Sequence, residues 1–311
     1  MNRKHKFVKM LHSKSFKYFD SHCHINGILQ KMKLEPNFSF NSLSSNWPKG
    51  FDGCISIPLE NVSQFDAFFK VRHPKIFYAV GLHPLFIKQY NKEYDDKLIN
   101  HFLTDPRVRA IGEIGFDRYK GESTIDLQKK YFIRQIEISN QIYQKNINSN
   151  NFEKRTMPIV IHTRRADEDT YDVLKNFVPH DKIMHIHCFS GSLSFCENVL
   201  ANWKNAFFGI TGKILYKEDV SKHIKDIVKY VPIEKILAET DSPFLMPPQL
   251  KQEFSTPALI PSIIKEIRSY LLEYFGKGIP TRSDKNNQLI SVLMVQILQT
   301  SLFDTLSPLY E

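Results

Sequence analysis

The feature that most constrains the fold is a series of eight short apolar segments, many of them rich in β-branched and aromatic residues. Such segments are typical of β-strands, and most stretches between them show helical patterns, for example 61–71, 92–103 and 124–144. The eight segments are 18–24, 53–58, 76–81, 108–115, 158–161, 183–186, 206–210 and 236–240. Alternating strands and helices indicate a parallel α/β sheet, and eight such units in roughly 250 residues fit a (β/α)8 barrel. No Gly-x-Gly-x-x-Gly motif follows the first segment, which disfavours a doubly wound open sheet, so we expect a single-domain TIM-like barrel.

Positive charge is concentrated at the N-terminus. The formal net charge of the 311 residues is +9, and residues 1–19 supply six lysines and arginines with no acid. We expect residues 1–17 to form a basic arm ahead of a barrel domain at 18–311. The charge allows a polyanionic partner without requiring one, and a solvated arm, a functional tail and a mitochondrial transit peptide stay open. Two polar stretches, 145–156 and 276–287, are expected to be insertions, the second ahead of a final helix at 288–303.

The cysteines and the apolar runs indicate a compartment. The four cysteines are too few and too scattered for a disulfide framework, so we expect reduced thiols in an intracellular protein. No apolar run reaches the roughly 18 residues of a membrane span, and no apolar segment of a signal peptide follows the basic N-terminus. The expected localisation is cytoplasmic, with nucleus and mitochondrion left open, and no membrane partner is expected.

Residues of metal-ligand type stand where six of the predicted strands end. His22 and His24 are two residues apart, so on a strand both side chains point to one face. The whole set is His22, His24, His83, Glu113, His162, His187 and Asp241. Because the carboxyl ends of barrel strands meet at one face, we expect these side chains to converge. Mixed nitrogen and oxygen ligands suit Zn, Mn, Co or Mg, whereas His185, deeper in its strand, is expected to be a satisfied core histidine.

Six short motifs, in order along the chain, resemble the signature series of the TatD family of metal-dependent deoxyribonucleases, which belong to the amidohydrolase-like barrel superfamily. The motifs are Ser21-His22-Cys23-His24, Gly81-Leu82-His83-Pro84, Gly112-Glu113-Ile114-Gly115-Phe116-Asp117, Ile161-His162-Thr163-Arg164, His187-Cys188-Phe189-Ser190-Gly191 and Glu239-Thr240-Asp241-Ser242-Pro243. The resemblance covers roughly residues 18–245. It departs from the family after the eighth strand, where Lys251-Gln252-Glu253-Phe254-Ser255-Thr256-Pro257 keeps only the proline, which puts the substrate preference in doubt.

The resemblance implies two divalent metal ions, with Mg, Mn and Zn all open. By the family pattern, His22, His24 and Asp241 hold the first ion. His162 and His187 hold the second, and Glu113 bridges the two. A pair of cations can bind both the attacking and the leaving oxygen of a phosphodiester and ionise a water near neutral pH. Asp241 is then the expected proton acceptor, so Asp241, Glu113 and His83 form the predicted catalytic set.

The predicted substrate contacts lie beside this set. His83 is not a ligand in the family pattern and is expected to face the substrate phosphate. Arg164 can bind two phosphate oxygens at once, and Lys213, at the end of the seventh strand, is either a phosphate contact or a surface lysine. The aromatic residues near the mouth of the barrel either stack on bases or simply pack, namely Tyr119, Phe189 and Phe244.

Three functions are compatible with these residues. The first is a two-metal hydrolase of DNA phosphodiester bonds that acts as a 3′–5′ exonuclease. The second is a metal-dependent hydrolase of amide or ester bonds on the same barrel, such as a tRNA deacylase. The third is a non-catalytic nucleic-acid-binding protein, which the intact ligand set argues against. The sequence leaves open DNA or RNA, exo or endo action, and the oligomeric state, a monomer included.

Overall fold

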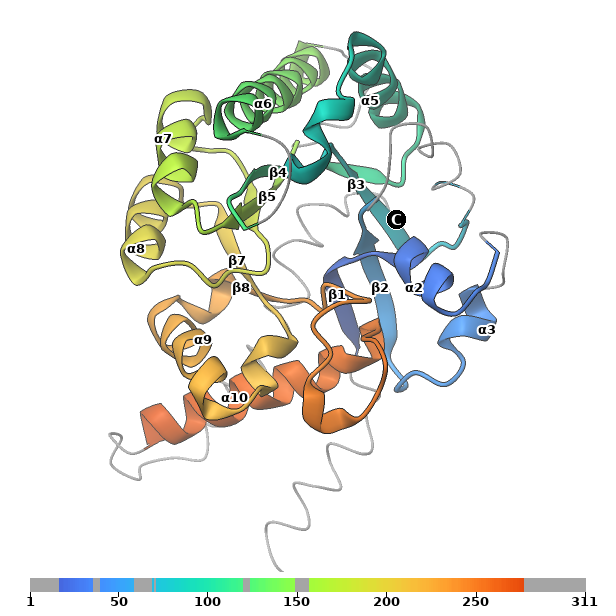
Figure 1. The fold of residues 1–311 in the computed structure, drawn as a ribbon, viewed down its shortest axis with the longest axis vertical. Helices are drawn as coiled ribbons and strands as arrows, with labels where there is room; N and C mark the ends of the chain where they lie inside the picture. Colours follow the sequence, from blue (N-terminus) through green and yellow to red (C-terminus); the bar gives the residue numbers. More distant parts are fainter. Residues whose placement is uncertain are drawn as a thin grey trace, which may run out of the picture.

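The computed structural model describes residues 17–35, 40–58, 69, 71–119, 124–148 and 157–276. In this part of the chain, eight parallel strands form one sheet in sequence order. They are β1 (Tyr18–Cys23), β2 (Phe51–Ser56), β3 (Ile76–Val80), β4 (Val108–Asp117), β5 (Ile159–Arg164), β6 (Met184–Ile186), β7 (Ala206–Ile210) and β8 (Ile236–Ala238). The sheet curves into a nearly closed barrel, which confirms the predicted TIM-like architecture (Figure 1).

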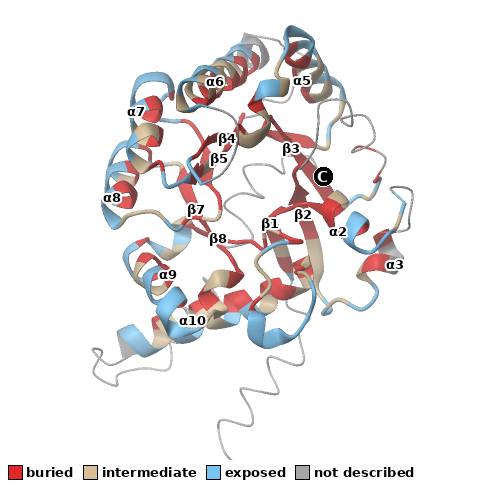
Figure 2. Cartoon of the chain, viewed as in Figure 1, coloured by how far each residue is buried: buried red, intermediate tan, exposed pale blue. Residues whose placement is uncertain are grey.

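Helices form an outer ring around the strands (Figure 1). They are α2 (Ile25–Lys31), α3 (Phe40–Ser44), α5 (Lys92–Thr104), α6 (Ile125–Asn148), α7 (Asp167–Phe177), α8 (Leu193–Asn202), α9 (Glu218–Tyr230) and α10 (Ile260–Gly276). Short 3₁₀ turns complete the connections: η2 (Pro84–Gln89), η3 (Gly212–Leu215), η4 (Ile233–Lys235), η5 (Pro248–Leu250) and η6 (Pro257–Leu259). The strands are buried while the helices expose their outer faces, so the main apolar core lies between the two layers (Figure 2).

The barrel closes between β8 and β1 by a few specific bonds. No strand ladder joins these two strands among the described residues. Just past the end of β8, the Asp241 N–H donates to the His22 carbonyl at 2.9 Å, and the His24 N–H donates to the Ser242 carbonyl at 2.7 Å. Between the strands themselves, the Ser21 hydroxyl in β1 donates to the Ala238 carbonyl in β8 at 3.1 Å. The segments at the ends of β1 and β8, which carry predicted ligands, are therefore hydrogen-bonded directly to each other.

A buried carboxylate supports the same seam. Asp20 accepts hydrogen bonds from the Thr240 N–H at 3.0 Å, the Thr240 hydroxyl at 2.6 Å and the His22 N–H at 3.2 Å. Each of these donors would otherwise lie buried without a strand ladder to satisfy it. Asp20 thus replaces ladder hydrogen bonds between the first and last strands, and we call this network the β8–β1 seam.

The structure differs from the sequence predictions mainly at the ends of elements. Strand β5 continues through Arg164, three residues past its apolar segment, and β8 ends two residues before the predicted Thr240. Helix α6 runs on to Asn148, so the expected insertion at 145–156 begins as helix, and residues 149–156 lie outside the described part. The basic arm, apart from residue 17, most of the predicted helix at 61–71, the stretch 277–287 and the predicted helix at 288–303 also lie outside it.

Two further observations bear on the compartment predictions. None of the described helices is both long and apolar enough to cross a membrane. All four cysteines are free thiols, as expected, and three of them are buried.

Candidate metal centre

The six predicted metal ligands converge at the carboxyl end of the barrel. His22 and His24 come from the end of β1, Glu113 from β4 and His162 from β5, while His187 and Asp241 follow β6 and β8. Together with His83, their nitrogen and oxygen atoms form overlapping groups in which every ligand atom lies within 4.8 Å of the others: His22, His24 and Asp241; His22, Glu113 and His187; and His83, Glu113 and His162. Residues up to 219 positions apart in the sequence (241 − 22) thus share one pocket of ligand atoms.

The first group, His22, His24 and Asp241, lies on the side of the site next to the β8–β1 seam. Asp241 Oδ1 is 3.1 Å from His24 Nε2 and 3.6 Å from His22 Nε2. The other ring nitrogen of His24, Nδ1, is 2.9 Å from the Ile57 carbonyl, so Nδ1 is a donor and Nε2 is the nitrogen that faces Asp241 and the site. This arrangement is the one that the strand alternation of His22 and His24 predicted.

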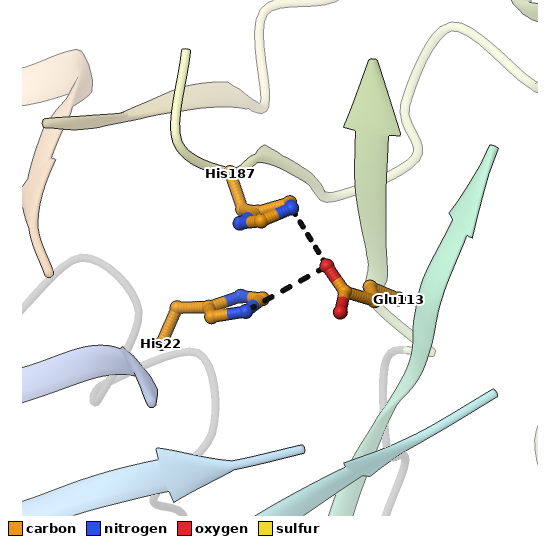
Figure 3. A group of neighbouring side chains, drawn as sticks. All are labelled: His22, Glu113 and His187. Atoms are coloured by element: carbon orange, nitrogen blue, oxygen red, sulfur yellow. Dashed lines mark ion pairs between the residues drawn. The ribbon is translucent and has the colours of Figure 1, made fainter. Parts of the chain in front are cut away.

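The second group consists of Glu113, His162 and His187 and is organised around one oxygen of Glu113. Its Oε2 lies 2.7 Å from His187 Nε2, 3.4 Å from His162 Nδ1 and 3.7 Å from His22 Nε2. Figure 3 shows His22 and His187 with their rings side by side, both facing this oxygen, and the rings are stacked at 3.9 Å between centroids. Glu113 therefore faces a histidine of the first group on one side and the remaining histidines on the other.

The donor set fits a divalent cation. Glu113 Oε2, both ring nitrogens of His22 and His187 Nδ1 are buried without a well-formed hydrogen bond among the described residues. Buried polar atoms are normally satisfied, so such a cluster needs a ligand to explain it. The nitrogen–oxygen separations run from 2.7 to 3.7 Å and bracket the spacing of neighbouring ligands around one ion, about 3–3.5 Å for bonds of about 2.1 Å. The residues could therefore hold metal, and Glu113 is placed where it could contact more than one ion.

The protonation states of the metal-free site point the same way. Burial and the neighbouring His187 hold the pKa of His22 well below its ordinary value, so its ring is neutral and offers lone pairs. Burial alone would raise the pKa of Glu113, but the neighbouring histidines outweigh it and lower the pKa well below the usual range. Burial alone would lower the pKa of His162, but the neighbouring carboxylates of Asp117 and Glu113 raise it to about 9. Without metal, a proton on His162 thus supplies positive charge beside Glu113.

Helix α6 and the strand β4 hold this site from behind. The side-chain amide of Gln135 accepts from the Leu82 N–H at 2.7 Å, next to His83, and Gln128 accepts from the Asp117 N–H at 2.9 Å. Asp117 Oδ2 in turn lies 3.1 Å from His162 Nε2. A carboxylate on the outer nitrogen of a ligating histidine is the usual device that fixes its ring orientation. Two buried glutamines of one helix therefore position the ends of two strands.

His83 lies beside the metal ligands without joining the tightest contacts. Its ring centroid is 4.4 Å from that of His162, and its Nδ1 accepts a hydrogen bond from the Leu85 N–H at 3.0 Å. Burial and the nearby His162 lower the pKa of His83 to about 3, so the ring is neutral. With Nδ1 acting as an acceptor, the proton is on Nε2, and His83 can donate one hydrogen bond.

The two predicted cationic substrate contacts, Arg164 and Lys213, lie in different surroundings. Arg164 is exposed at the rim, with its guanidinium 3.8 Å from the Tyr119 ring centroid and 3.9 Å from Asp117 Oδ2. Lys213 is directed at Cys188, whose sulfur is 3.6 Å from its Nζ.

Sequence reasoning missed three residues behind the site. Asp117 and Glu239 lie within the matched motifs, and this membership was the available signal. Glu239 is fully buried, accepts from the Cys188 N–H and has its Oε1 3.9 Å from His187 Nδ1. His185 is buried as predicted, but its Nε2 lies 2.7 Å from Glu239 Oε2 without a well-formed hydrogen bond, so it is not a satisfied core histidine.

Comparisons with known proteins agree with this geometry. The family model described as TatD related DNase matches residues 19–273. The human 3′-5′ RNA nuclease TATDN2 is 30% identical over 258 residues, which cover 80% of this chain and 32% of that protein, so the chain spans about a third of it. An uncharacterized metal-dependent hydrolase of Mycoplasma genitalium is 28% identical over 252 residues, covering 78% of this chain and 87% of the relative.

A solved structure supports the fold. The crystal structure of YJJV, a TatD homolog from Escherichia coli K12, has a TM-score of 0.71 and 19% sequence identity, and the match covers 96% of this chain and 100% of that one. The family model spans the six motifs and most of the barrel. The chain therefore belongs to the TatD-related DNase family and is a metal-dependent hydrolase.

Proposed function

We propose that this protein is a two-metal phosphodiesterase that removes nucleotides from the 3′ end of DNA. The observation that carries the proposal is the position of Glu113 Oε2, which lies within 3.7 Å of ring nitrogens from both groups of ligands. One carboxylate between two sets of ligands is what a pair of cations requires. The family name and the nuclease name of the human relative support nucleic acid as the substrate.

The proposed ligand assignment follows the two groups. His22, His24 and Asp241 would hold one ion, His162 and His187 the other, and Glu113 would bridge them, with Mg, Mn and Zn as candidate metals. When bound, such a pair neutralises phosphate charge and lowers the pKa of water to near neutrality. All six residues come from one chain, so the site is complete without a second copy.

The remaining steps belong to the side chains of this chain. Asp241 is half-buried at the mouth of the site, and its carboxylate accepts the proton of the attacking water. His83 donates a hydrogen bond from Nε2 to a phosphate oxygen, because its Nδ1 is already occupied by the Leu85 N–H. Arg164 lies at the rim, where its planar guanidinium can bind two oxygens of a neighbouring phosphate. Lys213 has less support as a phosphate contact, since it is directed at Cys188.

The test is a hydrolysis assay on purified protein with end-labelled single-stranded DNA, double-stranded DNA and RNA, and with an aminoacyl ester. We expect shortening of DNA from its 3′ end that stops in excess EDTA after dialysis and returns with added Mg²⁺, Mn²⁺ or Zn²⁺. Label retained at the 5′ end of every shortened product identifies the direction. Undiminished hydrolysis after exhaustive chelation would contradict the metal assignment, and cleavage of the aminoacyl ester alone would replace the nuclease with an esterase.

A further inference from the structure

A cavity lies directly beside the metal centre, and Arg164 is the one residue of its lining that the chemistry described above uses. It has a volume of about 800 Å³ and opens between the ends of β4 and β5, the start of α7 and the loop that follows β6. Tyr119, Arg164 and Arg165 line it together with Arg118, Glu168 and Asp169. Its size is that of a small-molecule site rather than a crevice between side chains.

One carboxylate connects this cavity to the metal centre. Asp117 Oδ2 is 3.1 Å from His162 Nε2 and 3.9 Å from Arg164 Nη1. Its other oxygen, Oδ1, accepts from the Tyr119 N–H at 2.7 Å. The lining residues Tyr119 and Arg164 therefore sit one side chain away from a metal ligand, which is the reach of a nucleotide whose phosphate is at the metals.

The cavity wall contains a stacking platform. The Arg164 guanidinium carbon is 3.8 Å from the Tyr119 ring centroid, and that of Arg165 is 5.0 Å from it. Tyr119 nevertheless keeps 42% of its surface exposed. Aromatic rings and guanidinium planes are the surfaces on which unpaired nucleobases stack. Arg165 also adopts a left-handed backbone conformation, with φ of 56°, which is uncommon for a residue other than glycine.

The charges in the wall leave two arginines available for a phosphate. Asp169 is paired with Arg118 at 2.7 Å, and Asp167 accepts from the N–H and the hydroxyl of Ser192. Among the described residues, the one ion pair of Arg164 is the 3.9 Å contact with Asp117, and Arg165 forms no ion pair. Glu168 is exposed. The positive charge nearest to the metal centre is therefore the less neutralised part of the wall.

We propose that this cavity is a nucleotide subsite. It holds the nucleotide next to the scissile phosphodiester, with the base against the Tyr119 ring and the flanking phosphate beside Arg164 and Arg165. The inference rests on the proposed nuclease function and adds to it a specific place for one unpaired base. A base can reach this platform only when it is out of a duplex stack, so the subsite binds a single-stranded end.

The test uses equilibrium binding of a fluorescein-labelled twelve-nucleotide oligothymidylate, measured by anisotropy in an Asp241→Asn background, where turnover should be slowed by roughly 10²–10⁴-fold. Tyr119→Leu should raise Kd about five- to 150-fold, the range found for single base–aromatic stacks. Tyr119→Phe keeps the ring and should stay within about twofold of the parent. Arg165→Ala should make the dependence of log Kd on log salt shallower by about 0.7.

A matched control is available on the far side of the ring of helices. Tyr274, in α10, is 43% exposed and lies against Lys229 at 4.0 Å, so it repeats the exposed tyrosine–cation pair away from the cavity. Tyr274→Leu should leave Kd unchanged. A second readout is the hydrolysis of bis(p-nitrophenyl) phosphate, a substrate without a nucleobase. Tyr119→Leu in otherwise wild-type enzyme should not slow this reaction.

The outcomes separate the subsite from the function. Hydrolysis of oligonucleotides with equal affinity in Tyr119→Leu and its parent overturns the subsite alone. Hydrolysis of bis(p-nitrophenyl) phosphate without binding or cleavage of any oligonucleotide overturns the proposed function together with the subsite. Loss of affinity in Tyr119→Leu that Tyr119→Phe restores, with bis(p-nitrophenyl) phosphate hydrolysis intact, supports the proposal.

Discussion

Two buried carboxylates of the same barrel face opposite situations. Asp20, in the β8–β1 seam, accepts three hydrogen bonds from His22 and Thr240. Glu113, across the barrel, has an oxygen buried among three imidazoles with no well-formed hydrogen bond among the described residues. The first acid has its hydrogen-bonding atoms satisfied by the protein itself, although burial raises its pKa to about 8. The second has an oxygen that we propose binds metal. The comparison therefore separates a structural acid from a proposed ligand, although both are buried and both lie near His22.

The two regions meet at Asp241. Its N–H belongs to the seam through the His22 carbonyl, and its carboxylate belongs to the metal centre through His24. The seam therefore fixes the backbone that carries one wall of the site. We expect changes in Glu113 to lower both metal binding and activity, and changes in Asp241 to lower mainly turnover. Changes in Asp20 should lower mainly the stability of the fold.

The largest effect is expected from Glu113→Gln. Both ions would lose a ligand, so turnover should fall by roughly 10⁴-fold or more and the bound metal should decrease. The unfolding free energy of the metal-free protein should also fall, because the neighbouring histidines stabilise the ionised carboxylate that this variant removes. Metal content by mass spectrometry, initial rates and urea unfolding measure the three quantities. Full metal occupancy in this variant would show that Glu113 is not a shared ligand.

Asp241→Asn should separate catalysis from metal binding. The amide keeps the size and one ligating oxygen but loses the charge and most of the basicity. Turnover should fall by roughly 10²–10⁴-fold, the contribution of a general base, while oligonucleotide binding and at least one metal ion remain. His187→Ala is the matched variant, since it should lose metal and activity together. Near-normal turnover in Asp241→Asn would place the base elsewhere.

Asp20→Ala should show the opposite pattern. Three buried donors would lose their acceptor, which should lower the unfolding free energy by about 3–5 kcal/mol. The metal centre should still fill in the folded fraction at low temperature. Urea unfolding of Asp20→Ala beside Glu113→Gln, both without metal, gives the comparison directly. The metal content of the two folded variants completes the comparison, and equal losses of bound metal would contradict the distinction between the seam and the centre.

The smallest effect concerns pH. In the metal-free protein the pKa of His162 is about 9, so at neutral pH a cation must displace its proton. Metal affinity should therefore rise from pH 7 to pH 9 by up to about tenfold per unit and then level off. The raised pKa also stabilises the metal-free fold below the ordinary histidine value of about 6.5, and this stability is lost as pH rises through 9.

Competition with a metal-sensitive dye across this range measures the pH effect, and Asp117→Asn is its control. Removing the Asp117 carboxylate removes a hydrogen bond that raises the pKa of His162. The rise in affinity should then occur at lower pH in Asp117→Asn. An identical pH profile in both proteins would mean that another group holds the displaced proton.

The sequence by itself determined the barrel and the identity of the converging residues. Both depend on local information: the alternation of apolar segments with helical patterns, and polar residues placed where each segment ends. Because parallel strands bring all their carboxyl ends to one face, such a pattern predicts convergence without any contact being known. His22, His24, Glu113, His162, His187 and Asp241 were found in this way and lie together in the structure.

Only the tertiary structure decided what each buried polar group faces. Asp20 and Glu113 are both acids within strands, and no local pattern shows that one meets the donors of Thr240 while the other meets three imidazoles. Asp117 acquires its contact with His162 across the neighbouring strands β4 and β5, and Glu239, after β8, acquires its contact with His187, after β6, across the intervening strand β7. The same holds for the cavity beside Tyr119, whose walls come from separate loops. Hydrogen bonds and cavities depend on which chain segments are packed together, and that packing is a property of the closed barrel rather than of any one segment.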